Sequence, residues 1–436
     1  MGKAPEQLVG TPLDALVSPE VLEAVTKHLL ADLMVRKLGK GGIRITTRQR
    51  ARLVKWLSDG ANGEPPLPRE AKRMSSNLTI SVNARDERRL KGQMVGRAVA
   101  AVTETMATVA KRMARPALRD LKPELLRAAR QDDRFLRGFE RRLARTWKRG
   151  FELLEVQLYL AKSTAAEIND ELRRRATKVE MPLIEVLTSL HARACQIASE
   201  VLVLLRAGYP EGAISRWRSL HEVSIVLHFI HGHGVETARR YLAHDAVESW
   251  KGAKEYSEHC GELGFEPIDP AEFAEVKKAY EAAVKKYGPE FNGSYGWAAR
   301  DLGSKKTPKF EDVTKGAGFA HWRPLYRLAS HPVHANPKSV KLRLGIIPGG
   351  PRWLPVGPTN YGLADPGQNT GLSLLQTTAV LIGHAPTVER LLVREVMREL
   401  AHRIANAFVK AQFRIEGREM KFRAALAAAN SETPER

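Results

Sequence analysis

The chain has 436 residues, of which 43% are hydrophobic and 27% charged, a composition typical of a globular protein and not of a disordered one. Two cysteines exclude a disulfide framework, and the N-terminus shows no signal-peptide pattern, so the sequence predicts a cytoplasmic protein. No apolar run approaches the roughly 18 residues of a transmembrane helix, so we expect no membrane span.

The net charge of +21 is spread unevenly along the chain. Residues 41–150 hold 27 Lys and Arg against 11 Asp and Glu, which leaves +16 in about a quarter of the sequence. Charge concentrated in this way repels itself in the folded state and usually indicates a polyanionic partner. Nucleic acid is the first candidate partner, RNA more than DNA, and an anionic membrane surface is the second.

Helical periodicity dominates and predicts a mainly α fold, a multi-helix bundle with a basic helical N-terminal region. The predicted helices lie at 18–38, 48–57, 124–161, 163–178, 181–207, 210–232, 235–260, 271–287, 372–384 and 386–414. Residues 75–83 fit one strand or a loop. Residues 341–371, rich in Gly and Pro, predict an irregular segment or a short β-hairpin. The predicted domains are a small helical region 1–60, a basic region 61–161, a helical domain 162–415 and a disordered tail 416–436.

The helix predicted at 124–161 has two faces. Apolar residues recur every three or four positions and should face a core: Leu136, Phe139, Leu143, Trp147, Phe151, Leu154 and Leu158. Basic residues recur with the same period on the opposite side, and a shorter basic run precedes them. Because guanidinium forks bind phosphate oxygens bidentately, we expect nucleic-acid contacts from Arg112, Arg115, Arg119, Arg130, Arg134, Arg137, Arg141, Arg145 and Lys148. The alternative is a solvated charged face.

Several catalytic motifs are missing from the sequence. It holds no GxxxxGK[ST], no GxGxxG after a strand, no GxSxG, no HExxH and no CxxC pair. These absences argue against nucleotide hydrolysis, dinucleotide redox chemistry and zinc-protease chemistry. We expect no cofactor and no metal.

Two polar clusters interrupt the apolar helices of the C-terminal domain. In the first, Arg218 and Glu222 are four residues apart and share a helix face. The second runs from Tyr326 to Asn336 and contains two histidines, whose side chains titrate near neutral pH and suit proton transfer. The candidate catalytic residues are Arg218, Glu222, Arg327, Ser330, His331 and His334. The alternative is a buried structural ion pair with core histidines.

Two stretches resemble a bacterial all-helical domain of unknown function. In that family a leucine-rich helix, a Gly-Tyr turn and an Arg-Ser-Leu-x-Glu pattern precede a Tyr-x-x-x-Ser-x-x-x-His pattern. The first corresponds here to Leu204–Ala213 followed by Arg216–Glu222, and the second to Tyr326, Ser330 and His334. The resemblance covers roughly residues 150–400 and implies an all-helical fold, with no established activity.

A second analogy is to the HEPN-type ribonucleases, which pair an arginine with a histidine four to six residues later. Arg327 and His334 have six residues between them, the longest interval that this pairing allows, although Leu328 and Pro332 depart from the HEPN pattern. The analogy implies metal-independent RNA cleavage, in which histidine acts as a base and arginine stabilises the developing phosphorane charge. A role in bacterial phage defence or stress is implied by the analogy alone.

The sequence therefore favours a cytoplasmic nucleic-acid-binding protein, with metal-independent endoribonuclease activity as the candidate reaction. Two alternatives stay open: a non-catalytic nucleic-acid-binding or scaffold protein, and a metal-dependent hydrolase using His221, His228, His331 or His334 with Glu222. Convergence of the two polar clusters on one accessible cleft would favour the first interpretation. The oligomeric state and the target sequence do not follow from these patterns.

Overall fold

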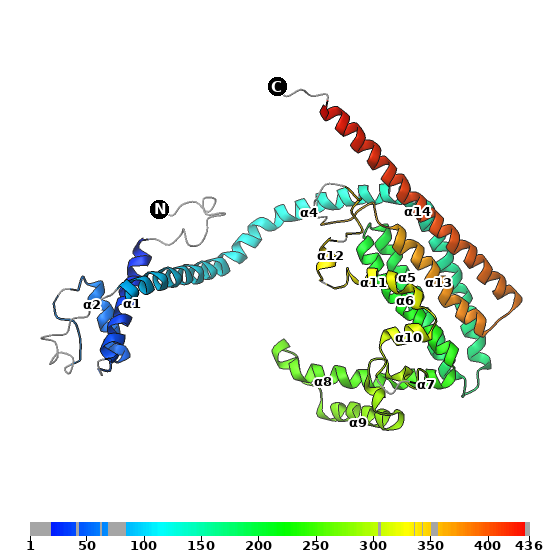
Figure 1. Cartoon of the computed structure of the whole chain (residues 1–436), viewed down its shortest axis with the longest axis horizontal. Helices are drawn as coiled ribbons and strands as arrows, with labels where there is room; N and C mark the ends of the chain where they lie inside the picture. Colours follow the sequence, from blue (N-terminus) through cyan, green and yellow to red (C-terminus); the bar gives the residue numbers. More distant parts are fainter. Residues whose placement is uncertain are drawn as a thin grey trace. The chain divides into compact units, whose positions relative to one another are not determined.

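The described part of the chain is all-helical in the computed structural model, and no residue in it forms a strand (Figure 1). The predicted mainly α fold is confirmed. None of the described helices combines the length and apolarity that crossing a bilayer needs. The structure describes residues 19–40, 43–61, 63–68, 84–303, 307–334, 336–341, 343–349 and 356–431. The strand considered for residues 75–83 lies outside these ranges.

The chain divides into two compact units, Met1–Asp132 and Asp133–Arg436. The first unit contains a helical hairpin of α1 (Pro19–Lys40) and α2 (Thr47–Ser58). The side chain of Asp32 on α1 accepts a hydrogen bond at 2.5 Å from the Arg50 guanidinium on α2. Both helices agree closely with their predicted ranges.

Helix α4 (Ala84–Arg175) is one continuous helix where the sequence predicts separate helices at 124–161 and 163–178. It passes through Pro116 and Pro123, each of which lacks an N–H and leaves the carbonyl four residues earlier without an intrahelical partner. This stretch of α4 is exposed, so water can bond the freed carbonyls. The two prolines therefore do not end the helix, and the predicted start at 124 is wrong.

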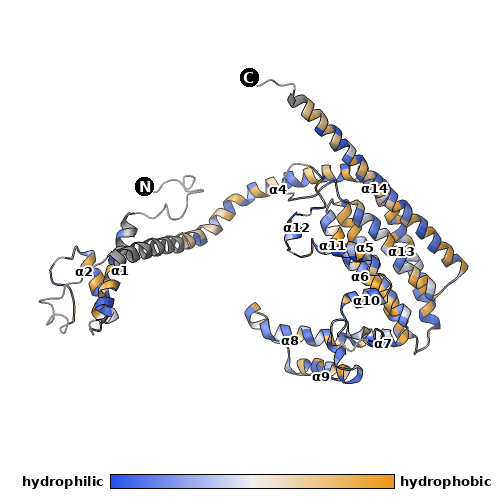
Figure 2. Cartoon of the chain, in the orientation of Figure 1, coloured by the Kyte–Doolittle hydropathy of each residue, from blue (hydrophilic) through white to orange (hydrophobic). Residues whose placement is uncertain are grey.

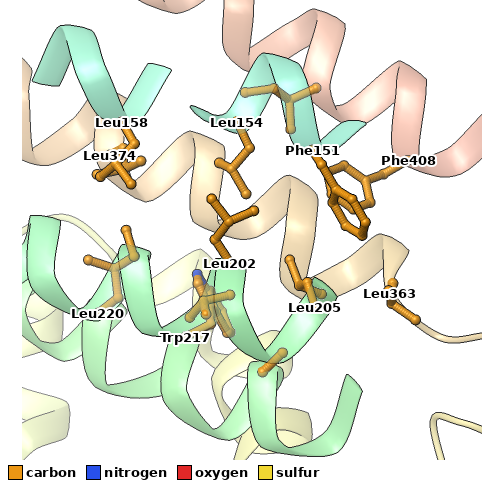
Figure 3. Close-up of a cluster of buried hydrophobic side chains, with 14 of the residues drawn as sticks. Phe151, Leu154, Leu158, Leu202, Leu205, Trp217, Leu220, Leu363, Leu374 and Phe408 are labelled. Carbon is orange, nitrogen blue, oxygen red and sulfur yellow. The ribbon is translucent and has the colours of Figure 1, made fainter. Parts of the chain in front are cut away.

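Four further helices pack around the C-terminal part of α4 to build the second unit (Figure 1). They are α5 (Met181–Arg206), α6 (Pro210–His233), α13 (Ala364–His384) and α14 (Val388–Ser431). The apolar face predicted for 124–161 is confirmed as core from Leu143 onward, and Figure 3 shows Phe151, Leu154 and Leu158 facing this cluster. Leu136 and Phe139, nearer its start, are only half-buried.

Phe408 of α14 packs against both α4 and α13. A Cβ atom at Gly150 of α4 would lie 2.9 Å from its ring, and one at Gly367 of α13 would lie 2.5 Å away. Any larger residue at Gly150 or Gly367 would therefore clash with the Phe408 ring unless the core repacked. The centre of the Phe408 ring also lies 5.7 Å from that of Trp147. It lies 5.9 Å from the ring centre of Phe151, which Figure 3 shows beside it.

The break between α5 and α6 falls where the Gly208-Tyr209-Pro210 stretch predicts it. Gly208 has a φ of +81°, a conformation that favours glycine. An added Cβ would also lie 2.8 Å from the ring of Phe139. The carbonyl of Gly208 accepts a hydrogen bond at 2.8 Å from the Thr359 N–H, which attaches the segment before α13 to this turn.

The single helix predicted at 235–260 is two helices, α7 (Val235–Ala243) and α8 (Asp245–Leu263). His244 lies between them, and its buried imidazole Nε2 is 2.7 Å from the Gly293 carbonyl oxygen. The break between α7 and α8 therefore coincides with a contact to a distant loop, and nothing in the local periodicity of the sequence predicts this break. Helix α9 (Pro270–Tyr287) follows as predicted, with Asp269 as its N-cap.

Three short helices complete the unit: α10 (Phe310–Gly316), α11 (Arg323–Ser330) and α12 (Pro337–Lys341). The insertion predicted near 341–371 has no β-hairpin among its described residues. Residues 343–349 and 356–363 are turns and coil, and α13 already begins at Ala364, so the irregular alternative holds.

Helix α14 continues to Ser431, well into the stretch 416–436 that the sequence predicts as a disordered tail. The segment is rich in Ala, Glu and Arg, residues of high helix propensity, and it contains no proline before 431. Its last described turns therefore extend a helix already nucleated in the core.

Candidate functional site

A three-residue polar cluster joins α6 to α11. The hydroxyl of Tyr326 donates to the Glu222 carboxylate at 2.5 Å and accepts from the Arg218 guanidinium at 2.6 Å. Arg218 and Glu222 also meet directly, with an N–O distance of 2.9 Å, and the guanidinium lies 4.8 Å from the centre of the Tyr326 ring. The predicted Arg218–Glu222 pair is therefore confirmed, with tyrosine as a third member.

The pair is half-buried, which differs from the buried ion pair considered as the alternative to a catalytic role. The side chain of Arg218 is 22% exposed and that of Glu222 is 31% exposed. Water reaches both groups, so their attraction is partly screened. Burial, together with the hydrogen bond to Glu222, raises the pKa of the Tyr326 phenol, which therefore stays protonated and holds its donor role at neutral pH.

His221 lies on α6 inside a cage of aromatic rings. It is 1% exposed and stacks on Trp217 with ring centres 5.3 Å apart, while Phe319 and Trp322 lie within 6.0 Å. Within the described part of the chain its Nδ1 atom has no hydrogen-bond partner. Burial lowers the pKa of His221 to about 4, so its imidazole is neutral at pH 7.

A cavity of about 590 Å³ opens beside this cluster and is bounded by α6, α10 and α11. His221 and Tyr326 line it, together with the predicted site residues Arg327 and Ser330. The Ser330 hydroxyl donates to the Tyr326 carbonyl of its own helix at 2.8 Å. Two of the predicted catalytic residues thus reach the cavity, and two more, Arg218 and Glu222, hold one of its walls through Tyr326.

The two remaining predicted residues, His331 and His334, do not join this site. His334 is exposed, and the Nδ1 atom of half-buried His331 is 3.3 Å from the side-chain nitrogen of Asn336. Neither lines the cavity or bonds to the Arg218 cluster among the residues described. Helix α11 ends at Ser330, so both histidines leave the helical face that the Tyr-x-x-x-Ser spacing defines.

The metal-hydrolase alternative lacks a ligand set in the described ranges. No three His, Cys, Asp or Glu side chains there gather closely enough to hold an ion. His228, one of the ligands considered, instead places its Nδ1 atom 2.8 Å from the carbonyl oxygen of Ser224 on its own helix.

All nine predicted nucleic-acid contacts on α4 are exposed. Three have carboxylate neighbours: Arg119 beside Asp120, Arg137 beside Asp133, and Lys148 beside Glu152. For the others no ion pair is seen within the described residues: Arg112, Arg115, Arg130, Arg134, Arg141 and Arg145. Figure 2 shows the polar and apolar stripes alternating along the described part of α4.

Arginines from α4 and α14 line a common groove of about 510 Å³, which the sequence did not predict. Its arginines are Arg142 and Arg145 from α4 and Arg414 and Arg418 from α14. Phe139 and Asn360 complete its lining together with two apolar or hydroxyl side chains, and no carboxylate contributes to it. Asn360 is held in place by the Trp147 indole, which donates to its side-chain oxygen at 2.9 Å.

Only Arg145 of these four arginines belonged to the predicted contacts. Lys410, Arg414 and Arg418 recur at intervals of four, the same signal that identified the row on α4. Lys410 and Arg414 lay in the predicted helix 386–414, and the prediction of disorder from residue 416 concealed only Arg418, because a periodic face exists only if the helix continues.

Comparison with known proteins was made against families, curated proteins and solved structures. Residues 184–347 match a family of unknown function, DUF5677. No curated protein and no solved structure matches the chain. The DUF5677 match is narrower than the resemblance over 150–400, and no comparison supports the analogy to HEPN-type ribonucleases.

The DUF5677 match spans α5 to α12 and so includes the Arg218–Glu222–Tyr326 cluster and the cavity beside it. It excludes α4 and α14, and with them the arginine-lined groove. The family therefore contributes nothing to an interpretation of the basic surface, which depends on this chain's own geometry.

Proposed function

We propose that this chain binds nucleic acid, specifically single-stranded RNA, along the groove between α4 and α14. The observation that carries the proposal is the convergence of Arg142, Arg145, Arg414 and Arg418 on one groove whose lining holds no carboxylate. Since unpaired cations repel one another, such a groove favours an anion that neutralises them.

The chemistry of the lining suits a phosphate backbone. Guanidinium groups bind phosphate oxygens through two parallel hydrogen bonds, and four of them on two helices match successive phosphates better than a single ion. Arg141 lies one helical turn from Arg145 on α4, with Arg137 and Arg134 beyond it, so the basic row continues along the helix. The affinity should be largely independent of base sequence.

A single strand is favoured over a duplex by the aromatic side chain in the groove. Phe139 is half-buried and lines the groove beside the arginines. Unpaired bases stack on such rings, whereas bases inside a duplex are not accessible to them.

The test is a binding titration with labelled single-stranded RNA, single-stranded DNA and duplex DNA at two salt concentrations. Replacing all four groove arginines by Ala should weaken RNA binding sharply. It should also reduce the slope of log affinity against log salt by about 0.7 for each phosphate that the variant no longer neutralises. The matched control removes four exposed charges elsewhere: Arg174, Lys278, Lys285 and Arg300. Equal slopes in the two quadruple variants would contradict the proposal.

Cleavage of the bound RNA stays a prediction. Arg327 lines the cavity, but its proposed partner His334 is exposed and does not. If the pair is nonetheless catalytic, His334→Ala should abolish RNA cleavage and leave RNA binding unchanged, and the wild type should cleave in EDTA. A wild-type chain that binds RNA and cleaves none would establish the non-catalytic alternative.

A further inference from the structure

The cavity beside the Arg218–Glu222–Tyr326 cluster carries a strong positive charge. Four cations line it, against one carboxylate, that of Glu311. The cations are Lys309, Lys315, Arg323 and Arg327. Glu311 is already engaged, since Lys315 lies 3.1 Å from its carboxylate and Arg323 also contacts it. Among the described residues no ion pair is seen for Lys309 or Arg327, although the Asp312 carboxylate accepts a hydrogen bond from the Lys309 backbone N–H at 2.8 Å.

One wall of the cavity is aromatic and fixed in position. Phe310 and Tyr326 lie with ring centres 5.2 Å apart, and both line the cavity. The Tyr326 hydroxyl is held by Glu222 and Arg218, as described above, so its ring is positioned before any ligand arrives. A planar ring can pack beside such a wall with little loss of side-chain entropy.

We propose that this cavity binds a nucleoside monophosphate. The phosphate would be bound by Lys309 and Arg327 at the mouth of the cavity, and the base would pack beside Phe310 and Tyr326. The proposal goes beyond RNA binding by the groove between α4 and α14, because it uses none of the groove residues.

The dimensions favour one nucleotide over a polynucleotide. A volume of about 590 Å³ lies within the range of small-molecule pockets, roughly 300–1,000 Å³. The recognition elements also differ in kind, since both cations and aromatic rings line the same cavity. A strand would need cations repeated along its length, as in the groove between α4 and α14.

The test is isothermal titration calorimetry of the full chain with AMP, GMP, CMP and UMP, and with adenosine and inorganic phosphate as the separated parts. At least one nucleotide should bind at least about 10-fold more tightly than either part, because charge-assisted hydrogen bonds and ring packing act together. If none of the four nucleotides binds, the proposal is wrong. If inorganic phosphate binds as tightly as every nucleotide, the rings add no affinity and the assignment to a nucleotide is overturned.

Variants locate the site. Lys309→Ala and Arg327→Ala should each weaken nucleotide binding by about 10-fold, since each removes a charge-assisted hydrogen bond. Ala320→Trp places a large ring at an exposed position in the lining and should abolish binding. These variants should bind RNA as the wild type does. Nucleotide affinity unchanged in all three would place the ligand elsewhere and overturn the assignment.

The Ala variant of the four groove arginines is the reciprocal control and should bind nucleotides normally. Loss of nucleotide binding in that variant would place the nucleotide in the groove between α4 and α14 and contradict the proposal.

Discussion

Two stretches of α4 have the same kind of sequence and different surroundings. Between residues 139 and 158 the apolar side chains are mostly buried against α5, α13 and α14. Between residues 106 and 126 apolar side chains recur at similar spacing and stay exposed, with Val109 at 52% and Leu118 at 61%. Periodicity thus identifies which face of a helix is apolar, and only the neighbouring helices decide whether that face becomes core.

The basic residues of the two stretches differ in the same way. Lys111, Arg112 and Arg115 stand on a helix that is exposed on every side. Arg142 and Arg145 lie on the part of α4 that packs beside α14, and two arginines of α14, Arg414 and Arg418, line the same groove. The groove exists because the core beneath it holds α4 and α14 together, so core packing and the proposed RNA site are coupled.

The largest contrast should come from removing one apolar side chain from each stretch. Phe151→Ala opens a cavity beside Phe408 and should lower the free energy of unfolding by about 3–5 kcal/mol. Val109→Ala removes exposed methyl groups and should change it by less than about 0.5 kcal/mol. Urea midpoints measure both effects. A large decrease in Val109→Ala would mean that this stretch of α4 is covered in solution.

Ion pairs should show the same contrast between interior and surface. The Arg240 guanidinium is buried and contacts both carboxylate oxygens of Asp301 at 2.6 Å, so Asp301→Ala should cost about 3–5 kcal/mol by leaving a buried charge unpaired. Asp133→Ala removes the partner of Arg137 on the exposed part of α4 and should cost less than about 1 kcal/mol. Comparable costs in the two variants, measured by urea unfolding, would show that Arg240 is not sealed from water.

Acid should destabilise the packed region through its buried histidines. Burial lowers the pKa of His191 and of His221 to about 4, whereas an unfolded histidine titrates near 6.5. Their neutral native forms lose stability as the pH falls from about 6.5 to about 4, since the unfolded chain binds protons that the native state excludes. The loss is at most about 3 kcal/mol for each histidine. His191→Gln should flatten the pH dependence of the urea midpoint, and the exposed His334→Gln should leave it unchanged.

A smaller effect than at the buried Arg240–Asp301 pair is expected at the half-buried cluster. Glu222→Ala should cost about 1–2 kcal/mol, less than a sealed pair would, because water reaches Arg218 and Tyr326 also bonds to it. A double-mutant cycle with Arg218→Ala should give a coupling energy of at least about 0.5 kcal/mol. Additive costs in the cycle would mean that the two side chains do not interact in solution.

Much of the fold could be predicted because its signals are local. The break at Gly208 and Pro210 follows from the positive φ that glycine tolerates and from the starting position that proline prefers in a helix. The apolar face from Leu143 to Leu158 follows from helical spacing. The missed features are those in which a distant contact overrides the local pattern, such as His244 between α7 and α8, which meets Gly293.

The candidate site was predicted only in part for the same reason. The spacing of Arg218 and Glu222 on one helix was sufficient to pair them. Tyr326 enters their cluster from 104 residues away in sequence from Glu222, and no spacing rule connects the two. His331 and His334 illustrate the reverse case, because a pattern that holds along a helix fails once α11 ends at Ser330.

The sequence by itself determined the helical class, the two-faced helix, the turn at Gly208 and the basic row on α4, since each depends on the 3.6-residue period or on the backbone of one residue. Only the tertiary structure decided that Arg414 and Arg418 join Arg142 and Arg145, and that Tyr326 joins Arg218 and Glu222 beside a cavity. Helices meet according to the packing of many side chains at once, and each of those contacts contributes only a small part of the total.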